Sequence, residues 1–215
     1  SNIVLIDEIN RAPAKTQAAL FEVMEERQVT VDGKTYPMKP PFMVLATQNP
    51  VEQEGTYRLP EAQLDRFLFK VLVPYPNETE EFEILKQFHS IGSSDPLAVV
   101  EPVLRAEQIV NVRKQVKNVV IEEKLLQFIA KLTHQTRNHK SIYLGGSPRA
   151  SLAIMNASKA MAAINGRDFV TPEDILDVVP PVLRHRIILS PDKEMEGVTE
   201  DTVIKQIIQS MDIPR

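Results

Sequence analysis

The sequence predicts a mixed α/β fold in which a parallel sheet with a hairpin insertion is followed by an all-helical domain. Between residues 3 and 73, short apolar runs alternate with helical patterns, as expected of parallel strands joined by helices. From residue 77 onward, apolar residues recur at helical spacing behind cap residues. We therefore expect an α/β part over residues 1–76, a helical part over 77–190, and a C-terminal extension with one helix over 191–215.

Composition excludes several classes of protein. The 215 residues include no cysteine, which excludes disulfides, thiolate metal sites and cysteine nucleophiles. No apolar run approaches the ~18 residues of a membrane-spanning helix. The net charge of −4 gives no electrostatic reason to expect nucleic acid as a partner. We expect a cytoplasmic protein, and a strand that begins at residue 3 with no element before it indicates a piece of a longer one.

The first strand comprises residues 3–6, an apolar run that suits a strand buried on both faces of a sheet. Pro13 then favours the start of a helix, which we expect to end at Glu26 or Arg27. These two elements form the first strand–helix unit of the α/β part.

A hairpin and two further strands complete the α/β part. Asp32-Gly33 between two short β-type runs is the strongest two-residue hairpin signal. Residues 42–47 form the second apolar run, a short helix follows Leu59-Pro60, and residues 69–73 form a third strand.

The helical part begins at Asn77, which with Glu80 resembles a capping box. A linker is expected at 92–96. Further helices are expected at 106–117, at 122–138, from Pro148 to the residue before Gly166, from Pro172 to about Pro180-Pro181, and after Thr199, with a short strand at 187–189.

Two carboxylates, Asp7 and Glu8, directly follow the first strand, at the edge where open α/β sheets bind ligands. Asp7 can hold Mg²⁺, which keeps most of its waters and takes one or two carboxylates. Glu8 points to the other side of the strand and can polarise a water for attack on a terminal phosphate. Taken alone, the pattern fits a core strand with a solvated acidic end equally well.

Five segments make the sequence similar to the MoxR family of AAA+ ATPases. They are residues 3–13 (IVLIDEINRAP), which resemble the Walker B segment, 46–50 (ATQNP), 59–67 (LPEAQLDRF), 145–150 (GGSPRA) and 182–186 (VLRHR). Their order and spacing match the family over nearly the whole chain. The resemblance implies part of an AAA+ P-loop core followed by its lid domain.

The resemblance implies roles for five residues. Asp7 orders the magnesium ion, Glu8 polarises the attacking water, and Asn49 is sensor 1, whose amide is a donor and an acceptor without charge. Arg66 matches the arginine finger that reaches the nucleotide of the next subunit, and Arg149 matches sensor 2. We expect these groups to converge on one triphosphate, with Arg149 reaching it from the lid and Arg66 from the neighbouring subunit.

From the sequence alone, two of these residues also fit purely structural roles. Asn49 suits a turn before Pro50, and Arg66 suits an ion pair with Asp65 or Glu61 on a surface helix. The basic residues that compete with Arg66 for the role of finger are Arg11, Arg58 and Lys70.

Arg149 and His185 lead to different conclusions. Arg149 follows the cap residue Ser147 in the first turn of a helix, where a bare arginine opposes the helix dipole and requires an anionic partner. His185 has no identifiable carboxylate partner, so a structural or interface role is preferred to catalysis.

The phosphate-binding loop of the family, Gly-x-x-x-x-Gly-Lys-Ser/Thr, does not occur in residues 1–215. Backbone amides and the lysine of this loop supply most of the nucleotide affinity of such sites. We therefore expect this chain alone to bind ATP very weakly and to be inactive, while the parent protein hydrolyses ATP.

The resemblance implies a parent that uses ATP and Mg²⁺ in a homo-oligomeric ring, a hexamer, to remodel or assemble protein partners as a chaperone does. Proteins with von Willebrand factor A-type domains are the implied partners. The alternatives are a DNA-acting or chelatase-type motor of the same branch, and a non-hydrolysing scaffold. The hairpin matches an insertion of this branch, so Lys34 and Tyr36 are candidates for substrate contact, although a plain surface hairpin also fits them.

Overall fold

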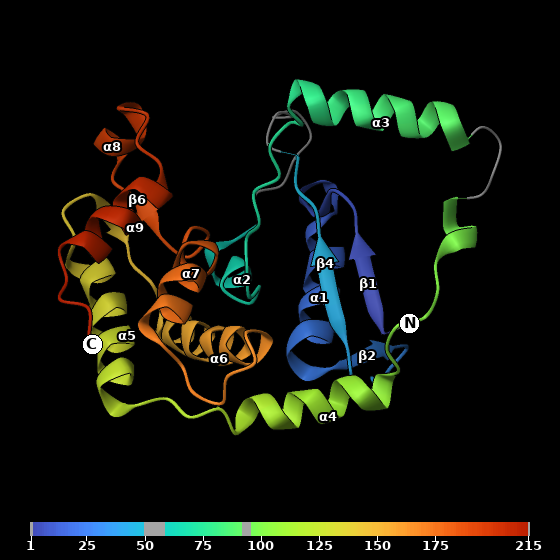
Figure 1. Cartoon of the computed structure of the whole chain (residues 1–215), viewed down its shortest axis with the longest axis horizontal. Coiled ribbons are helices and arrows are strands. Elements are labelled where there is room, and N and C mark those ends of the chain that lie inside the picture. The colour runs from blue at the N-terminus through green and yellow to red at the C-terminus, as the bar shows by residue number, and fades with distance from the viewer. Residues whose placement is uncertain (1, 50–58, 92–95, 215) are drawn as a thin grey trace.

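The computed structural model describes residues 2–49, 59–91 and 96–214, which form an α/β part and a helical part (Figure 1). In chain order, the elements are β1 (Ile3–Ile6), the 3-10 helix η1 (Ile9–Arg11), α1 (Ala14–Glu26), β2 (Gln28–Val31), β3 (Lys34–Pro37), β4 (Met43–Ala46), α2 (Glu61–Leu64), α3 (Glu78–Ile91), the 3-10 helix η2 (Pro96–Val99), α4 (Ala106–Lys117), α5 (Glu123–Asn138), β5 (Ile142–Leu144), α6 (Pro148–Ile164), α7 (Pro172–Leu183), β6 (Ile188–Leu189), α8 (Pro191–Met195) and α9 (Glu200–Gln209). The linker predicted at 92–96 lies largely outside the described residues.

The α/β part contains the predicted parallel sheet. β1 and β4 pair in parallel, with Ile3 opposite Met43 and Ile6 opposite Ala46. Because both strands run the same way, their carboxyl ends meet at one edge of the sheet, where ligand sites of open α/β sheets lie. The mixed α/β fold predicted from the alternation of elements is thereby confirmed.

The expectation that the first strand is buried on both faces is wrong. Ile3 and Leu5 are 56% and 65% exposed, whereas Ile6 packs against a small apolar cluster that includes Ile9 and Phe21. Successive side chains of a strand point to opposite faces, and α1 contributes Phe21 to one face only. In the described part of the chain, the face with Ile3 and Leu5 is left open to solvent.

Helix α1 follows its predicted course and is tied to the edge of the sheet. Pro13 occupies the N-cap position, and Arg27 ends the helix with a left-handed φ of 53°. Gln17, which is 3% exposed, donates from Nε2 to the carbonyl oxygens of Ile9 and Ala12 at 3.3 and 3.1 Å. The start of α1 is thereby fixed to η1, directly after the carboxyl end of β1.

The predicted hairpin is confirmed. β2 and β3 pair antiparallel, with Val31 opposite Lys34. Asp32 and Gly33 between them have φ values of 50° and 75°, and a type I′ turn requires positive φ at both central residues. Tyr36 is 50% exposed, and the Lys34 ammonium lies 5.3 Å from the centre of its ring.

The apolar run at 69–73 does not form the predicted third strand. Val71 and Val73 are 72% and 88% exposed, and the Lys70 N–H donates to the carbonyl of Pro181 in the helical part at 2.9 Å. A strand needs a neighbour with free backbone donors and acceptors, and among the described residues no strand lies beside this run.

The predicted helices of the second part are present, and the capping box of α3 forms, since Asn77 Oδ1 accepts from the Glu80 N–H at 3.0 Å. One end differs from the prediction, because α7 continues through Pro180 and Pro181 to Leu183. Proline removes helical hydrogen bonds to the preceding turn, but the last turn still closes because the Arg184 N–H donates to the Pro180 carbonyl at 3.0 Å.

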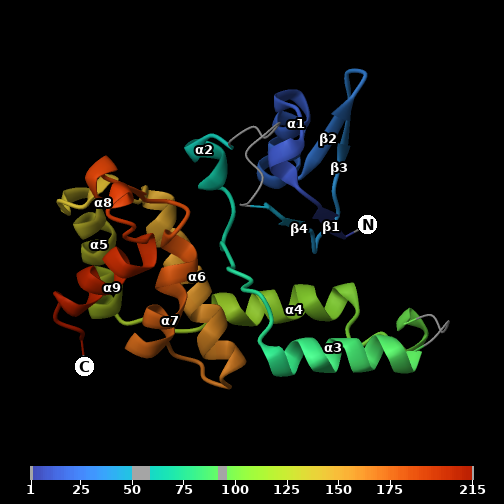
Figure 2. The same ribbon diagram turned by 90° about the horizontal axis from the view of Figure 1, so that it is seen from above.

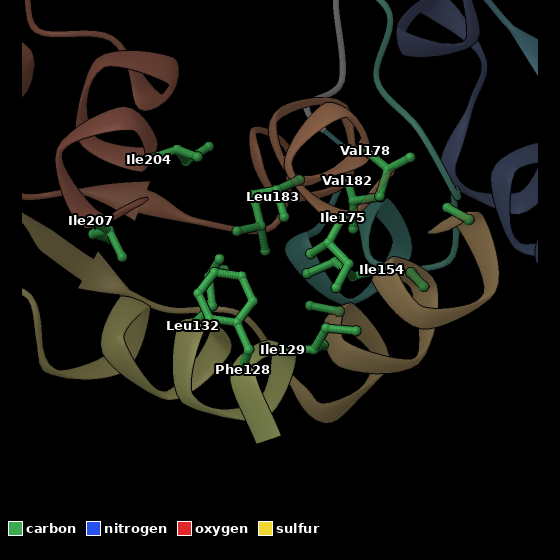
Figure 3. Packing of buried hydrophobic residues seen from close by; sticks show 14 of the residues in the cluster. Phe128, Ile129, Leu132, Ile154, Ile175, Val178, Val182, Leu183, Ile204 and Ile207 are labelled. Atoms are coloured by element: carbon green, nitrogen blue, oxygen red, sulfur yellow. The ribbon is translucent and has the colours of Figure 1, made fainter. Parts of the chain in front are cut away.

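A hydrophobic core joins α5, α6, α7 and α9 of the helical part (Figure 3). Side chains of α5, α6, α7 and α9 point toward one another there, among them Phe128, Ile129, Leu132, Ile154, Ile175, Val178, Leu183, Ile204 and Ile207. Ile204 and Ile207 are 1% and 2% exposed, so α9 packs into this core although it lies beyond residue 190. Among the described residues, no helix combines the length and apolar character that a bilayer crossing requires.

Figures 1 and 2 both place α2 where the α/β part and the helical part meet. Leu64 and Phe67, in and just after α2, pack against the apolar cluster beside α1. The chain that leaves α2 then bonds to α7 through Lys70, as described above. The segment around α2 therefore joins the two parts.

Candidate active site

Thr47, the first residue after β4, connects the two carboxylates predicted to carry the chemistry. Its hydroxyl donates to Asp7 Oδ1 at 2.5 Å and accepts from the Glu8 N–H at 2.9 Å. Its backbone N–H donates to the Ile6 carbonyl at 2.9 Å, and its carbonyl accepts from the Ile9 N–H at 3.1 Å. The loop that carries Asp7 and Glu8 is thus fixed to the end of the neighbouring strand.

Glu8 has an uncommon backbone conformation, with φ 50° and ψ 53° in the left-handed region. Residues other than glycine seldom adopt it, and such residues gather at functional sites. The Glu8 carboxylate pairs with Arg11 Nη1 at 3.1 Å, and the two side chains are 33% and 47% exposed. A pair this exposed is weak, so the carboxylate remains available to water.

Asn49 is half-buried and follows Thr47 by two residues, so it stays near the edge that carries Asp7 and Glu8. The parallel register of β1 and β4 accounts for this placement, because both strands end at this edge. Pro50, on which the turn role of Asn49 depends, lies outside the described residues, as does Arg58.

Arg66 and Arg149 meet at Glu25, near the end of α1. One Glu25 oxygen accepts from Arg66 Nη1, and the other accepts from Arg149 Nη2 at 3.0 Å. The side chains of Arg66, Arg149 and Glu25 are 29%, 48% and 42% exposed, so each pair contributes at most about 1 kcal/mol. Both guanidinium groups can exchange Glu25 for another anion at little cost.

The two arginines do not lie at the edge that carries the carboxylates. An α-helix rises about 1.5 Å per residue, so Glu25 is roughly 16 Å from the start of α1 at Ala14. Arg66 and Arg149 line a pocket with residues 42–44, at the start of β4, whereas Asn49 lies beyond its end. One chain therefore holds two separate groups. Arg66 is the residue expected to act at the next subunit, whereas Arg149, expected to act from the lid, does not lie with Asp7 and Glu8 within the chain.

The local structure before α6 explains the placement of Arg149. Ser147 caps the helix, and its Oγ accepts from the Arg149 N–H at 3.1 Å. A Cβ at Gly145 would lie 2.6 Å from the backbone nitrogen of Arg137, so the tight approach before the cap requires glycine. Glu25 provides the anionic partner that an arginine in a first helical turn requires.

His185 lies in the helical part, away from Asp7 and Glu8, and contacts the backbone of Phe67. Its Nε2 lies 3.0 Å from the Phe67 carbonyl oxygen and donates to it, because a carbonyl only accepts. Burial, assisted by the neighbouring Arg186 guanidinium, lowers the pKa of His185 from 6.5 to about 4. The imidazole is therefore neutral at pH 7, and its buried Nδ1 has no hydrogen-bond partner among the described residues.

Sequence reasoning missed Thr47 and Glu25. The signal for Thr47 was its place between a strand and Asn49, where a hydroxyl can bond across the edge. Glu25 offers no comparable signal, since Glu22 and Glu26 belong to the same helix, and only tertiary packing distinguishes it.

The donors at the edge fit an ion that arrives with a nucleotide. The described residues contain no group of three or more histidine, aspartate or glutamate side chains that could enclose a metal ion. Mg²⁺ bound with a nucleotide needs only one or two protein carboxylates, because phosphate oxygens and waters complete its shell. Asp7, held by Thr47, and Glu8 supply that number.

Comparison with known proteins agrees with this architecture. The family model described as ATPase family associated with various cellular activities (AAA) matches residues 1–69, and the AAA lid domain matches residues 134–207. The crystal structure of a proposed ATPase from Cytophaga hutchinsonii ATCC 33406 has a TM-score of 0.92 and 41% identity, over 100% of this chain and 67% of that one.

Two relatives are similar over the whole chain. Protein YeaC of Bacillus subtilis (strain 168) is 45% identical over 99% of this chain and 66% of its own length. Chaperone MoxR1 of Mycobacterium tuberculosis (strain ATCC 25618 / H37Rv) is 41% identical over 100% of this chain and 58% of its own length. The chain thus spans about three fifths to two thirds of these relatives, and magnesium-chelatase subunits are similar at 26–29% identity. This chain belongs to the MoxR family of AAA+ ATPases.

Proposed function

We propose that the chain forms the Walker B half of an AAA+ ATPase core together with its lid, in a ring-shaped ATPase that remodels or assembles other proteins. One observation carries the proposal. Asp7 and Glu8 are fixed at one edge by Thr47, whereas Arg66 and Arg149 share Glu25 toward the other end of α1. The site has two halves that a single chain does not bring together.

Assembly into a ring unites these halves. A nucleotide at the edge with Asp7 and Glu8 is completed by the arginines of the neighbouring subunit, which leave Glu25 for the more highly charged phosphate oxygens. A head-to-tail interface of this kind repeats around a closed ring, so each site is served by its neighbour. We propose a hexamer.

Each residue then has a chemical role. Glu8 accepts a proton from the attacking water, Asn49 orients that water through its amide, and Asp7 holds the magnesium ion. Bound ATP with Mg²⁺ supplies the reacting phosphate and a cation that neutralises its charge. Arg149 binds phosphate oxygens, and Arg66 stabilises the charge that develops on the transferred group, a contribution of about 10³–10⁵ in rate where GTPases use such an arginine.

We propose that the phosphate-binding loop of the full ATPase lies outside these 215 residues, because the chain spans only 58–66% of the length of these relatives. Residues 1–215 contain no Gly-x-x-x-x-Gly-Lys-Ser/Thr sequence, so this chain alone is expected to bind ATP very weakly and to be inactive.

A protein substrate is the partner that the relatives favour, because MoxR1 is named a chaperone. Proteins with von Willebrand factor A-type domains are the partners that the family resemblance implies. The exposed hairpin presents Lys34 and Tyr36 side by side, and we propose this tip as a contact for the protein substrate.

A chelatase-type motor is the second candidate, because magnesium-chelatase subunits are among the relatives. A DNA-acting motor has less support, since the net charge of −4 provides no general attraction to phosphates. A non-hydrolysing scaffold would need neither the Thr47-fixed carboxylates nor the paired arginines.

The substitution Glu8→Gln in the full-length ATPase tests the proposal. An amide does not accept the proton of the attacking water, so turnover is expected to fall by about 10²–10⁴-fold, while ATP affinity is retained. Glu194→Gln, on the exposed side of α8, is the matched control and is expected to keep normal turnover. Normal turnover in Glu8→Gln would exclude Glu8 from the mechanism.

A further inference from the structure

Residues 65–70 follow α2 and include Arg66, and side chains of the lid bind the backbone of this segment. The Arg186 guanidinium donates from Nη2 to the carbonyl oxygens of Asp65, at 3.0 Å, and of Phe67. Its Nη1 donates to the Leu68 carbonyl at 3.1 Å, and its Nε donates to Asp65 Oδ1 at 2.9 Å. The Arg186 side chain is 3% exposed, so its guanidinium group bonds to this segment and has little contact with solvent.

Two further lid contacts extend the same attachment. Arg184 donates from Nη1 to the Lys70 carbonyl at 3.1 Å, while the Lys70 N–H donates to the Pro181 carbonyl at 2.9 Å. His185, which lies between Arg184 and Arg186 in the chain, donates to the Phe67 carbonyl. The backbone of residues 65–70 is therefore bonded to the lid from Asp65 to Lys70.

A second contact of Asp65 links the neighbours of the two arginines. Ser147 Oγ donates to Asp65 Oδ2 at 2.8 Å and accepts from the Arg149 N–H at 3.1 Å. Asp65 directly precedes Arg66 in the chain. One carboxylate thus connects Arg66 to the capping residue of the helix that carries Arg149.

We propose that Asp65, with Arg186 and Ser147 as its partners, is a positioning residue that keeps Arg66 and Arg149 at a fixed spacing. This inference rests on the proposed function of the two arginines at a neighbour's nucleotide. Asp65 touches no reacting atom. Its carboxylate has both oxygens bonded, and a satisfied polar network of this kind holds its members in one arrangement.

The spacing matters because both guanidinium groups must meet one phosphate chain. Functional groups need to be held within about 0.5 Å of their productive geometry, and the pairs with Glu25 are too exposed to achieve this. The Asp65–Arg186 pair is largely buried, with side chains 16% and 3% exposed, and supplies the rigidity.

Asp65→Asn in the full-length ATPase tests the inference, because the amide keeps the shape and loses the charge that Arg186 pairs with. We expect kcat to fall by about 10²-fold, the loss typical of a small displacement of a catalytic group. In an Arg66→Ala background, measured on its residual turnover, Asp65→Asn is expected to cause a smaller further fall than in the wild type, because the part of its effect that passes through Arg66 is already lost.

Asp174→Asn is the matched control. It breaks another buried lid ion pair, that of Asp174 with Arg167 at 2.6 Å, at a place that does not touch Arg66. We expect it to lower the melting temperature and to leave kcat of the folded enzyme unchanged. If Asp65→Asn does not fold, Ser147→Ala gives a second comparison, because it removes the bond of Asp65 to Ser147 and the cap bond to the Arg149 N–H and retains the pair of Asp65 with Arg186.

Hydrogen exchange of the Lys70 amide provides a readout that is independent of activity. Asp65→Asn should speed its exchange, because its bond to Pro181 depends on the attachment of residues 65–70, and should leave amides in α5 protected. Unchanged Lys70 exchange, normal kcat in Asp65→Asn, or a full additional loss in the Arg66→Ala background would each overturn the inference alone. Normal kcat in Arg66→Ala would overturn the proposed function and the inference with it.

Discussion

At the residue scale, the hydroxyl of Thr47 bonds to both Asp7 and Glu8, the two carboxylates at the edge of the sheet. It donates to Asp7 Oδ1 and accepts from the Glu8 N–H, while the Glu8 backbone adopts a left-handed conformation. A strained residue persists only where its surroundings hold it. The position of the Glu8 carboxylate therefore depends on Thr47.

We expect Thr47→Val in the full-length ATPase to reduce turnover more than stability. Valine has nearly the same shape but offers neither bond, and a hydrogen bond to a charged group contributes about 1.5–3 kcal/mol. Thr30→Val is the matched control, since the Thr30 hydroxyl also donates to a carboxylate at 2.5 Å, that of Glu22, away from the site. Equal loss of turnover in the two variants, measured by phosphate release, would contradict the role of Thr47.

His185 gives the fold a pH dependence whose direction follows from its surroundings. Burial and the adjacent Arg186 lower its pKa from 6.5 to about 4. The unfolded chain binds a proton near pH 6.5 and the folded chain only near pH 4, so stability falls as the pH falls through this window, by up to roughly 3 kcal/mol.

His185→Gln should remove this part of the pH dependence, because glutamine can donate to the Phe67 carbonyl and does not titrate. Urea unfolding between pH 7 and 4 would show a flatter profile for the variant than for the wild type. The difference between the two profiles isolates His185, because His139, whose pKa is also lowered by burial, is common to both. Parallel profiles would contradict the buried, neutral state of His185.

The sequence was sufficient to identify residues whose place depends on a strand end. Asp7, Glu8 and Asn49 follow apolar runs that pair in parallel, so their common edge could be predicted. Glu25 and Asp65 could not be identified as partners of Arg66, Arg149 and Arg186, because those contacts join segments far apart in the chain.

At the scale of elements, predictions that depend on nearby residues of the chain were confirmed, and predictions that depend on which other element packs alongside were wrong. The hairpin formed because Asp32 and Gly33 accept positive φ without help from other elements. The runs at 3–6 and 69–73 are both apolar, yet the first pairs with β4 along one edge and the second has no strand beside it among the described residues. An apolar run shows that burial is favourable and does not show what covers it.

Helix α9 provides an element-scale test, because it packs into the lid core from beyond the predicted end of the lid. Ile204→Ala is expected to destabilise the chain by about 2–5 kcal/mol, since the side chain is 1% exposed and its loss leaves a cavity. Ile164→Ala, at a side chain that is 77% exposed, should change stability by less than about 0.5 kcal/mol. Urea unfolding followed by circular dichroism measures both, and equal small effects would show that α9 is not part of this core.

At the scale of the whole molecule, the arrangement of the two half-sites accounts for the need to assemble. The carboxylates lie at the carboxyl edge of the sheet, and the arginines lie roughly 16 Å along α1, at the joint with the lid. The attachment of residues 65–70 to Arg186 places Arg66 under the control of the lid. A nucleotide-driven movement of one lid would thus change the position of Arg66 at the site of the next subunit.

Mixing of subunits measures this central claim directly. Glu8→Gln and Arg66→Ala rings are each expected to have very low turnover, because every site in either ring lacks one half. Rings assembled from both variants contain interfaces at which an intact Glu8 meets an intact Arg66 from the neighbour. We predict that the ATP turnover of such mixtures exceeds the sum of the separate variants and peaks near equal proportions. Absence of recovery at every mixing ratio would contradict a site shared between subunits.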